Sequence, residues 1–129
     1  MVIDTSAVIA ILFGEEEAER FGTAIDNDPS RLMSAASVLE ASLVVESELG
    51  EQGARELDFL LLKAGIETIP FNEEQLQVAR YAFREYGKGR HPAGLNFGDC
   101  FSYALSRTTG EPLLFKGDDF SQTDVAICP

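Results

Sequence analysis

Four acidic positions, far apart in the chain, carry the residue types most able to do chemistry. Asp4 directly follows an apolar opening segment, and Glu40 interrupts the apolar stripe of a predicted helix. Asp99 opens a second apolar helix, and the pair Asp118 and Asp119 follows a late apolar run. Carboxylates gathered in one pocket repel each other, and burial raises the cost of keeping them charged. Mg²⁺ or Mn²⁺ would relieve both costs, because these cations take oxygen ligands.

Three of these positions also have a purely structural interpretation. Asp4 is a helix N-cap residue type placed just before an apolar helix. Asp99 stands three residues after Asn96, which is the spacing of a capping box. Asp118 and Asp119 follow a glycine in a segment whose composition predicts a turn. Any one of these acids alone would be weak evidence for a metal site, whereas their combination predicts one.

Glu40 is harder to explain as structure alone. Its helical neighbours three and four residues away predict an apolar surrounding, in which a carboxylate should be paired, protonated or bound to metal. The alternative is a glutamate at the rim of the helix interface whose carboxylate reaches water. The neighbours are Ala36, Ser37, Leu43 and Val44.

Short apolar runs alternate with amphipathic segments along the whole chain. This alternation predicts an α/β fold with a mostly parallel sheet covered by helices on both faces. No linker or repeat interrupts the pattern, so residues 1–129 are expected to form a single domain. The predicted strands are 2–3, 31–34, 66–69, 113–115 and 125–127, and the predicted helices are 5–13, 15–26, 36–49, 53–64, 73–86 and 97–109.

Composition indicates an ordinary globular protein of the cytoplasm. Hydrophobic residues make up 45% and charged residues 25% of the chain, and no apolar stretch approaches the roughly 20 residues that span a bilayer. The opening residues lack the basic and cleavage features of a signal peptide. Cys100 and Cys128 have no cysteine or histidine at ligand spacing, which predicts reduced thiols without chemistry.

The charge distribution is uneven. The net charge of −12 argues against a general polyanion binder, and residues 1–79 hold sixteen of the 22 acids. Residues 80–116 carry six basic and three acidic residues, a local charge of +3. This stretch is either a solvated face or a rim that contacts phosphate. The acidic remainder could attract a basic protein partner.

A carboxylate pocket that binds divalent cations suits phosphoryl chemistry. The chain has no glycine-rich phosphate loop, no nucleophile elbow and no zinc spacing. Its single histidine, His91, lies in a glycine-rich loop, where it is either a loop residue without chemistry or a phosphate contact. Metal-assisted reaction at a phosphate ester is therefore the predicted chemistry.

With these motifs in place, the chain resembles the PIN-domain ribonucleases, and within them the VapC-type toxins of bacterial toxin–antitoxin pairs. The resemblance covers essentially the whole chain, and its most specific part is the segment around Asp99. The matching segments are residues 1–8, 37–40, 91–105, 113–120 and 123–125.

The resemblance implies a three-layer α/β/α PIN-like domain with acids clustered at the carboxyl edge of the strands. It also implies Mg²⁺- or Mn²⁺-dependent endonucleolytic cleavage of tRNA or rRNA. Asp4, Glu40 and Asp99 occupy the first three acidic positions of the family, and either Asp118 or Asp119 the fourth. As a hypothesis, Asp4 and Asp99 hold the principal ion, and Glu40 orients or deprotonates the attacking water.

Further expectations come from the same resemblance. Ser6 would hydrogen-bond within the acidic cluster, and the fourth acid would help to place a second ion. The family implies homodimers and a cognate VapB-type antitoxin whose basic tail lies across the acidic pocket. Substrate RNA would then depend on the local basic stretch, for which Arg84, Lys88 and Arg90 are the candidates.

Two other interpretations of the acids stay open at the level of sequence. A PIN-like domain could bind RNA or protein without cleaving, although every acidic position is filled. A haloacid-dehalogenase-like phosphatase would also place an aspartate after the first strand. That family requires a second aspartate two residues on, where this chain has Ser6.

Overall fold

A short parallel sheet organises the chain. The computed structural model describes residues 1–129, and its four strands lie in the order β3 (Glu67–Ile69), β2 (Leu32–Ser34), β1 (Val2–Ile3) and β4 (Leu113–Leu114). Val2 at the centre pairs with Leu32 on one side and Leu113 on the other. Because all four strands are parallel, their carboxyl ends meet at one edge of the sheet, where α/β proteins bind ligands.

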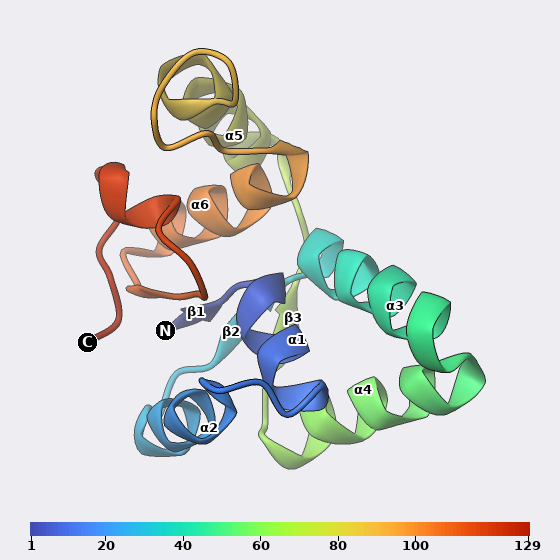
Figure 1. Ribbon diagram of the computed structural model, residues 1–129. Coiled ribbons are helices and arrows are strands. Elements are labelled where there is room, and N and C mark those ends of the chain that lie inside the picture. The colour runs from blue at the N-terminus through green and yellow to red at the C-terminus, as the bar shows by residue number, and fades with distance from the viewer.

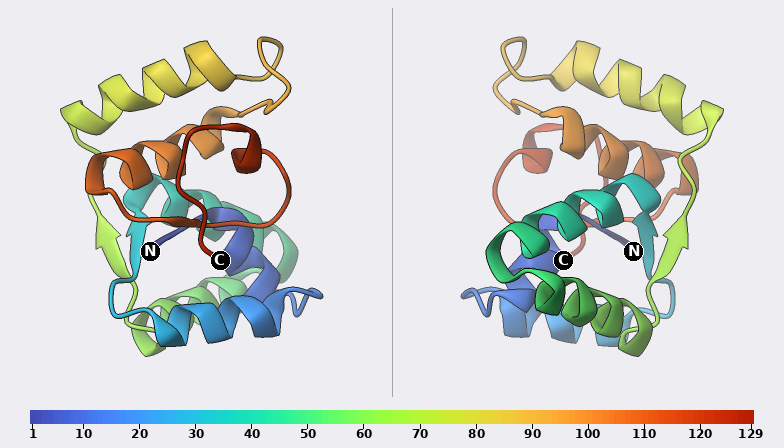
Figure 2. Two further views of the ribbon diagram at one scale, coloured as in Figure 1. Left: turned by 90° about the vertical axis from the view of Figure 1, so that its left-hand side faces the viewer. Right: turned by 90° about the vertical axis from the view of Figure 1, so that its right-hand side faces the viewer.

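Helices cover both faces of the sheet, so the predicted three-layer α/β/α architecture is confirmed (Figure 1). Figure 2 shows α5 outermost over α6 at one end of the molecule, with α2 and α4 at the opposite end. The helices are α1 (Thr5–Leu12), α2 (Ala18–Asn27), α3 (Ala35–Leu49), α4 (Glu51–Lys63), α5 (Glu73–Tyr86), α6 (Phe97–Thr109) and the 3₁₀ turn η1 (Phe120–Gln122).

The two faces of the sheet bury two separate cores. Successive strand residues point to opposite faces, so Ile3 packs into the core under α1–α4 and Val2 into the core under α5 and α6. Leu114 and Leu113 divide in the same way. This alternation is the reason that strands of only two or three residues are apolar throughout.

Local signals in the sequence place the helix starts. Asp4, Ser34, Asn72 and Asn96 each accept a hydrogen bond from a backbone N–H in the first turn of the following helix. These caps satisfy amide groups that the helix itself leaves unpaired. At the junction of α3 and α4, Gly50 adopts a φ of 63°, which a residue with a side chain rarely takes.

The structure differs from the expected elements at the last strand. Residues 125–127 were predicted to form a strand, but only one parallel bridge, between Leu113 and Ile127, is present. Residues 123–125 form a bend after η1, and only Ala126 and Cys128 share backbone hydrogen bonds with Leu113, so no ladder forms. No helix of the structure combines the length and the apolar character that crossing a bilayer requires.

Candidate active site

Asp4 lies at the carboxyl end of the central strand β1 and is buried. Its backbone N–H donates to the carbonyl of Leu114, which holds the ends of β1 and β4 together. Its Oδ2 accepts from the Ser6 backbone N–H at 3.0 Å and from the Ser6 hydroxyl at 2.7 Å. The predicted capping role of Asp4 and the predicted contact of Ser6 are thus both present.

A buried chain of hydroxyl groups holds the other oxygen of Asp4. Ser102 on α6 donates to Asp4 Oδ1 at 2.5 Å, and its Oγ lies 3.3 Å from the Ser37 Oγ on α3. Thr5 donates to the Ser37 carbonyl. Both Asp4 oxygens therefore accept hydrogen bonds, which fixes the carboxylate in one orientation.

Asp99 stands in the first turn of α6, facing the same site. Its Oδ2 accepts from the Asn96 backbone N–H at 3.0 Å, and Asn96 Oδ1 accepts from the Asp99 N–H at 2.9 Å. This is the complete capping box that the spacing predicted. Only one oxygen of Asp99 takes part in it, so the other stays available to a ligand.

Burial raises the pKa of Asp99 to about 7. The hydrogen bond from Asn96 opposes this shift, whereas the negative charges of Asp4, Asp119 and Glu40 add to it. Three acids from distant parts of the chain thus act on one carboxyl group. All three groups therefore lie close enough to Asp99 for their charges to act on it.

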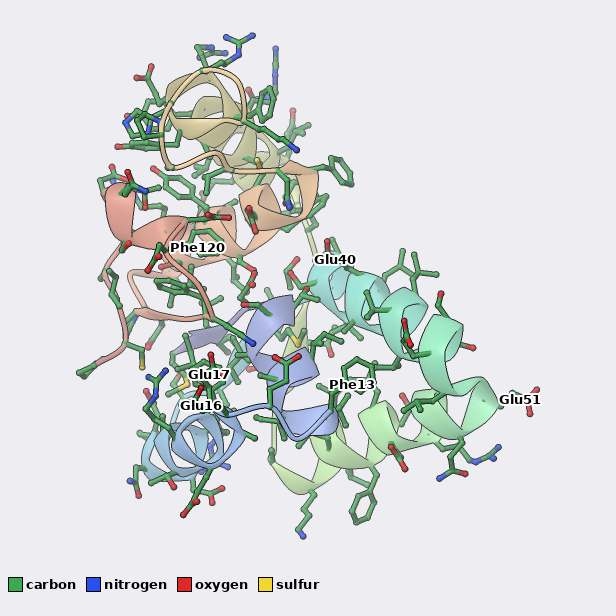
Figure 3. All side chains as sticks on the ribbon, in the orientation of Figure 1. Phe13, Glu16, Glu17, Glu40, Glu51 and Phe120 are labelled. Carbon is green, nitrogen blue, oxygen red and sulfur yellow. The ribbon has the colours of Figure 1, made fainter.

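Glu40 packs against the first turn of α6 at Gly98. A Cβ placed on Gly98 would lie 2.1 Å from Glu40 Oε2 and 2.7 Å from its Cδ, so the Glu40 carboxylate rests directly on the glycine backbone. Figure 3 shows Glu40 near the start of α3, on the side of that helix toward α6. Gly98 is therefore the residue that lets α3 and α6 bring Glu40 and Asp99 together.

The buried side of α3 differs from the predicted one. Leu43 and Val44 were expected to surround Glu40 with apolar groups, but their side chains are 59% and 37% exposed. The helix instead packs along Ser37, Ala41 and Val45, which are spaced by one turn. Glu40 is half-buried at the border of this stripe, where the contact with α6 and not an aliphatic surrounding determines its position.

The structure distinguishes between the two late aspartates. Asp119 contributes to the raised pKa of Asp99, whereas Asp118 does not appear among its causes. The Asp118 carbonyl accepts from the backbone N–H and the hydroxyl of Ser121, which closes the turn before η1. Both side chains are exposed. Asp119 is thus the one of the pair whose charge acts on Asp99, and which of the two is the fourth acid of the site stays a prediction.

None of these carboxylates forms an ion pair with a lysine or arginine. Lys116 lies beside the cluster, because its backbone N–H donates to the Ser6 hydroxyl. Its ammonium, however, lies 2.7 Å from Glu15 and 3.6 Å from Glu17. The cluster is thus a set of acids without a counter-charge from the chain itself.

The donor set fits a hard divalent cation. The structure has no group of three or more His, Cys, Asp or Glu side chains positioned to hold a metal ion. Mg²⁺ does not require such a cage, because it keeps several waters and is commonly bound by one or two carboxylates together with substrate phosphates. Asp4 and Asp99, with Glu40 and Asp119 nearby, supply oxygen donors of the required charge.

The predicted basic residues lie around the end of α5 and in the loop that follows it. Arg84 is exposed near the end of α5, and Lys88 and Arg90 are exposed in the loop that follows. Arg84 and Arg90 border a shallow hollow of ≈ 280 Å³, and the Arg90 guanidinium lies 5.6 Å from the centre of the Phe83 ring. Their contact with RNA stays a prediction.

His91 belongs to the structure of the same loop. Its Nδ1 accepts from the Ala93 backbone N–H at 3.0 Å, and its ring packs edge-on against Tyr86. Both contacts order the loop that leads into α6. The interpretation of His91 as a loop residue is therefore supported.

Ser102 and Gly98 are the site residues that the sequence reasoning did not identify. Ser102 follows Asp99 by three residues, and so lies on the same face of α6. A serine within a run of buried apolar residues was the available signal. Gly98, one residue before Asp99, was available too, because a glycine inside a helical segment often marks a close approach.

Residues 1–126 match the PIN domain family. Ribonuclease VapC30 of Mycobacterium tuberculosis is 56% identical over 126 residues, which cover 98% of this chain and 96% of that protein. Ribonuclease VapC of Mycolicibacterium smegmatis is also 56% identical, over 98% of each chain. Among solved structures, VapC20 of M. tuberculosis, a sarcin–ricin loop cleaving toxin, superposes with a TM-score of 0.78 at 17% identity, covering 97% of this chain and 95% of that one.

The fold is that of a PIN domain. The chain belongs to the PIN-domain family and, within it, to the VapC ribonucleases.

Proposed function

We propose that this chain is the toxin of a toxin–antitoxin pair and hydrolyses structured RNA, tRNA or rRNA, at a Mg²⁺ or Mn²⁺ site. The observation that carries this proposal is the coupling of Asp4, Glu40 and Asp119 to Asp99, whose pKa is raised to about 7. A carboxylate that is partly buried beside other negative charges costs free energy in its ionised form and does not stabilise the fold. Carboxylates with a raised pKa of this kind are typical of functional sites.

Asp4 and Asp99 would hold the principal ion. Asp4 is oriented by Ser6 and Ser102, and Asp99 by its capping bond, so both oxygen donors are preorganised on rigid elements. When bound, the cation would neutralise charge on the phosphate and lower the pKa of an attacking water. Cation binding would also stabilise the ionised form of Asp99 at neutral pH.

Glu40 would act on the attacking water, and Asp119 would complete the cluster. The Glu40 carboxylate has no hydrogen-bond donor from the protein, so its oxygens are free to accept a proton from a water molecule. Its placement over Gly98 keeps it on the Asp99 side of the site. Asp119 lies at the start of η1, where its exposed side chain can assist a second ion when substrate binds.

The proposed partners follow from the charges. RNA phosphates would contact Arg84, Lys88 and Arg90, which are exposed and adjacent in space or sequence. A VapB-type antitoxin would approach with a basic segment, because the chain carries −12 overall and its cluster lacks a counter-charge. The identity to VapC ribonucleases and the likeness in fold to VapC20, a toxin that cleaves the sarcin–ricin loop, support both partners.

The decisive experiment is cleavage of end-labelled tRNA and rRNA by the purified chain, with Mn²⁺, with Mg²⁺ and with chelator. Asp99→Asn is the test variant, because an asparagine can keep the capping bond while losing the charge. Asp58→Asn is the matched control, since Asp58 is exposed on α4, away from the site. We expect discrete metal-dependent fragments from the wild type and from Asp58→Asn, and none from Asp99→Asn.

Two results would contradict the proposal. Equal cleavage by the wild type and Asp99→Asn would show a contaminating ribonuclease or a site elsewhere. RNA that binds in a metal-dependent manner, without a cleavage product from any RNA tested, would favour the non-cleaving binding module.

A further inference from the structure

Lys116 places a basic side chain at the border of the carboxylate cluster. It follows the last residue of β4 by two positions, and its backbone N–H donates to the Ser6 hydroxyl at 2.9 Å. The same hydroxyl donates to Asp4 Oδ2 at 2.7 Å. The backbone of Lys116 is therefore connected to the cluster through two successive hydrogen bonds.

Two acids outside the cluster bind the ammonium of Lys116. It donates to Glu15 Oε1 at 2.7 Å and lies 3.6 Å from Glu17 Oε1. The hydrogen bond to Glu15 raises the pKa of Lys116, so the ammonium is charged at neutral pH. A free lysine beside acids without a counter-charge would be attracted to them. Glu15 and Glu17 thus keep the ammonium at the border and leave the cluster open to a cation.

Both acids belong to an ordered backbone segment between α1 and α2. The Glu15 N–H donates to the Ala10 carbonyl, and the Glu15 carbonyl accepts from the Ala18 N–H. Glu17 is the N-cap residue of α2, and its Oε1 is enclosed without a hydrogen-bond donor. The ammonium of Lys116 is therefore the positive charge that compensates this oxygen. A side chain that is flexible in most surroundings is held here at one point.

Stability gives little reason for this arrangement. The side chain of Lys116 is 40% exposed and that of Glu15 is 34% exposed, and ion pairs between exposed side chains contribute little to the free energy of unfolding. A lysine ammonium has three N–H donors, and Glu15 is its only partner within hydrogen-bond distance. The other donors are therefore free to bind a phosphate oxygen.

The predicted RNA contacts and Lys116 lie on opposite sides of the cluster. Arg84, Lys88 and Arg90 belong to α5 and the loop after it. The ammonium of Lys116 is bound at the start of α2. Figure 2 shows α5 and α2 at opposite ends of the molecule, and Figure 3 shows Glu17 on the α2 side. An endonuclease cuts within a strand, so the strand has to be held on both sides of the cleaved bond.

We propose that Lys116 binds the RNA backbone on the α2 side of the cluster, and that Glu15 and Glu17 position its ammonium for this contact. The inference rests on the proposed function, since it concerns the same RNA. A chain with a charge of −12 repels RNA, so each fixed cation beside the site matters for holding the strand. Lysine suits such a contact because it binds phosphate as a point charge, without reading the base.

Binding of end-labelled total tRNA and rRNA over a series of salt concentrations tests the inference. The measurements use the Asp99→Asn background, which is expected to bind RNA without cutting it. Lys116→Gln should weaken binding about tenfold and reduce the slope of log Kd against log salt by about 0.7–1, because roughly one phosphate contact is lost. Lys63→Gln is the matched control, since Lys63 is exposed at the end of α4, and it should change neither quantity. Neither substitution should change the melting temperature much.

A second comparison tests the positioning by Glu15. Glu15→Ala and Glu19→Ala remove the same charge, and Glu19 is exposed on α2. Loss of an acid by itself should favour RNA binding. Glu15→Ala should nevertheless bind RNA roughly threefold less tightly than Glu19→Ala, because it also frees the ammonium. This difference should vanish when Lys116→Gln is added to both variants.

The outcomes separate this inference from the proposed function. If the wild type cleaves RNA but Lys116→Gln changes neither the affinity nor the salt slope, the inference is overturned and the proposed function stands. Glu15→Ala that binds RNA as tightly as Glu19→Ala would overturn the positioning by Glu15. If the wild type cuts none of these RNAs and the Asp99→Asn protein binds none of them, both the inference and the proposed function are overturned.

Discussion

Gly98→Ala should separate activity from stability in this protein. The added Cβ would lie 2.1 Å from Glu40 Oε2, whereas ordinary van der Waals contact begins at 3.4 Å. The Glu40 carboxylate would therefore move by about 1.3 Å, the difference between these two distances. The backbone of Gly98 has no positive φ, so alanine fits the helix itself without strain.

The substitution should lower the cleavage rate strongly and change the stability only slightly. Misplacement of a reacting group by about 1 Å can cost a factor of about 100 in rate, so we expect cleavage to fall roughly a hundredfold. Stability should hardly change, because Glu40 is half-buried and its side chain can rotate away. Alanine is also the better helix former by roughly 0.5–1 kcal/mol, which would raise the melting temperature by a few degrees.

The assay compares cleavage rate constants and thermal melts for the wild type, Gly98→Ala and the control variants. Gly22→Ala is the matched control, because Gly22 lies within α2 and a Cβ there would meet no atom within 4 Å. It should show the stabilisation without any loss of activity. A variant that combines Gly98→Ala with Glu40→Gln should cleave no more slowly than Glu40→Gln alone, since both changes remove the same group from its position.

Wild-type cleavage by a folded Gly98→Ala protein would refute the role of Glu40 over Gly98. A large drop in melting temperature would refute the reasoning in another way, because it would show that the helices and not the Glu40 side chain had moved apart.

Three further predictions concern the same cluster. Ser102→Ala should lower the unfolding free energy by about 1–3 kcal/mol and slow cleavage, because it leaves a buried oxygen of Asp4 without its donor; chemical denaturation and cleavage rates measure the two effects. With chelator present, Asp99→Asn should melt higher than the wild type above pH 7, by on the order of 5 °C. That difference should vanish as the pH falls from 7 to 4, because the raised pKa of Asp99 lets the folded state bind the proton more tightly than the unfolded state does. A difference independent of pH would contradict this assignment. Asp119→Asn should slow cleavage at least tenfold and Asp118→Asn much less, since only Asp119 adds to the pKa of Asp99; the reverse order would make Asp118 the fourth acid.

Much of the fold was predictable because its signals are local. Asp4, Ser34, Asn72 and Asn96 mark helix starts by side-chain chemistry that acts over three residues, and each cap is present. The short apolar runs marked the four strands of the sheet. The prediction of a final strand at residues 125–127 was wrong. An apolar run indicates that a segment can pair with a strand, but it does not show how many residues of a neighbouring strand lie beside it.

The candidate site was predictable as a set of residues but not as an arrangement. Asp4, Glu40 and Asp99 could be selected because each is an acid that follows, interrupts or opens an apolar segment, and the charges of Asp4 and Glu40 both act on Asp99. The choice between Asp118 and Asp119 depends on the path of the chain after β4, which no local pattern describes. The orientation of α3 was predicted incorrectly for a related reason, because packing against neighbouring helices decides which side of an amphipathic helix is buried.

The sequence by itself determined the class of fold and the approximate positions of the helices, since these depend on propensities and contacts within one turn or strand. The predicted helix 15–26 begins three residues later, at Ala18, and the predicted helix 53–64 begins two residues earlier, at Glu51. Only the tertiary structure decided how the site is held. The bond from Ser102 to Asp4 joins residues 98 positions apart, and the contact of Glu40 with Gly98 joins two separate helices. Such contacts arise when whole elements pack, so their partners cannot be read from either segment alone.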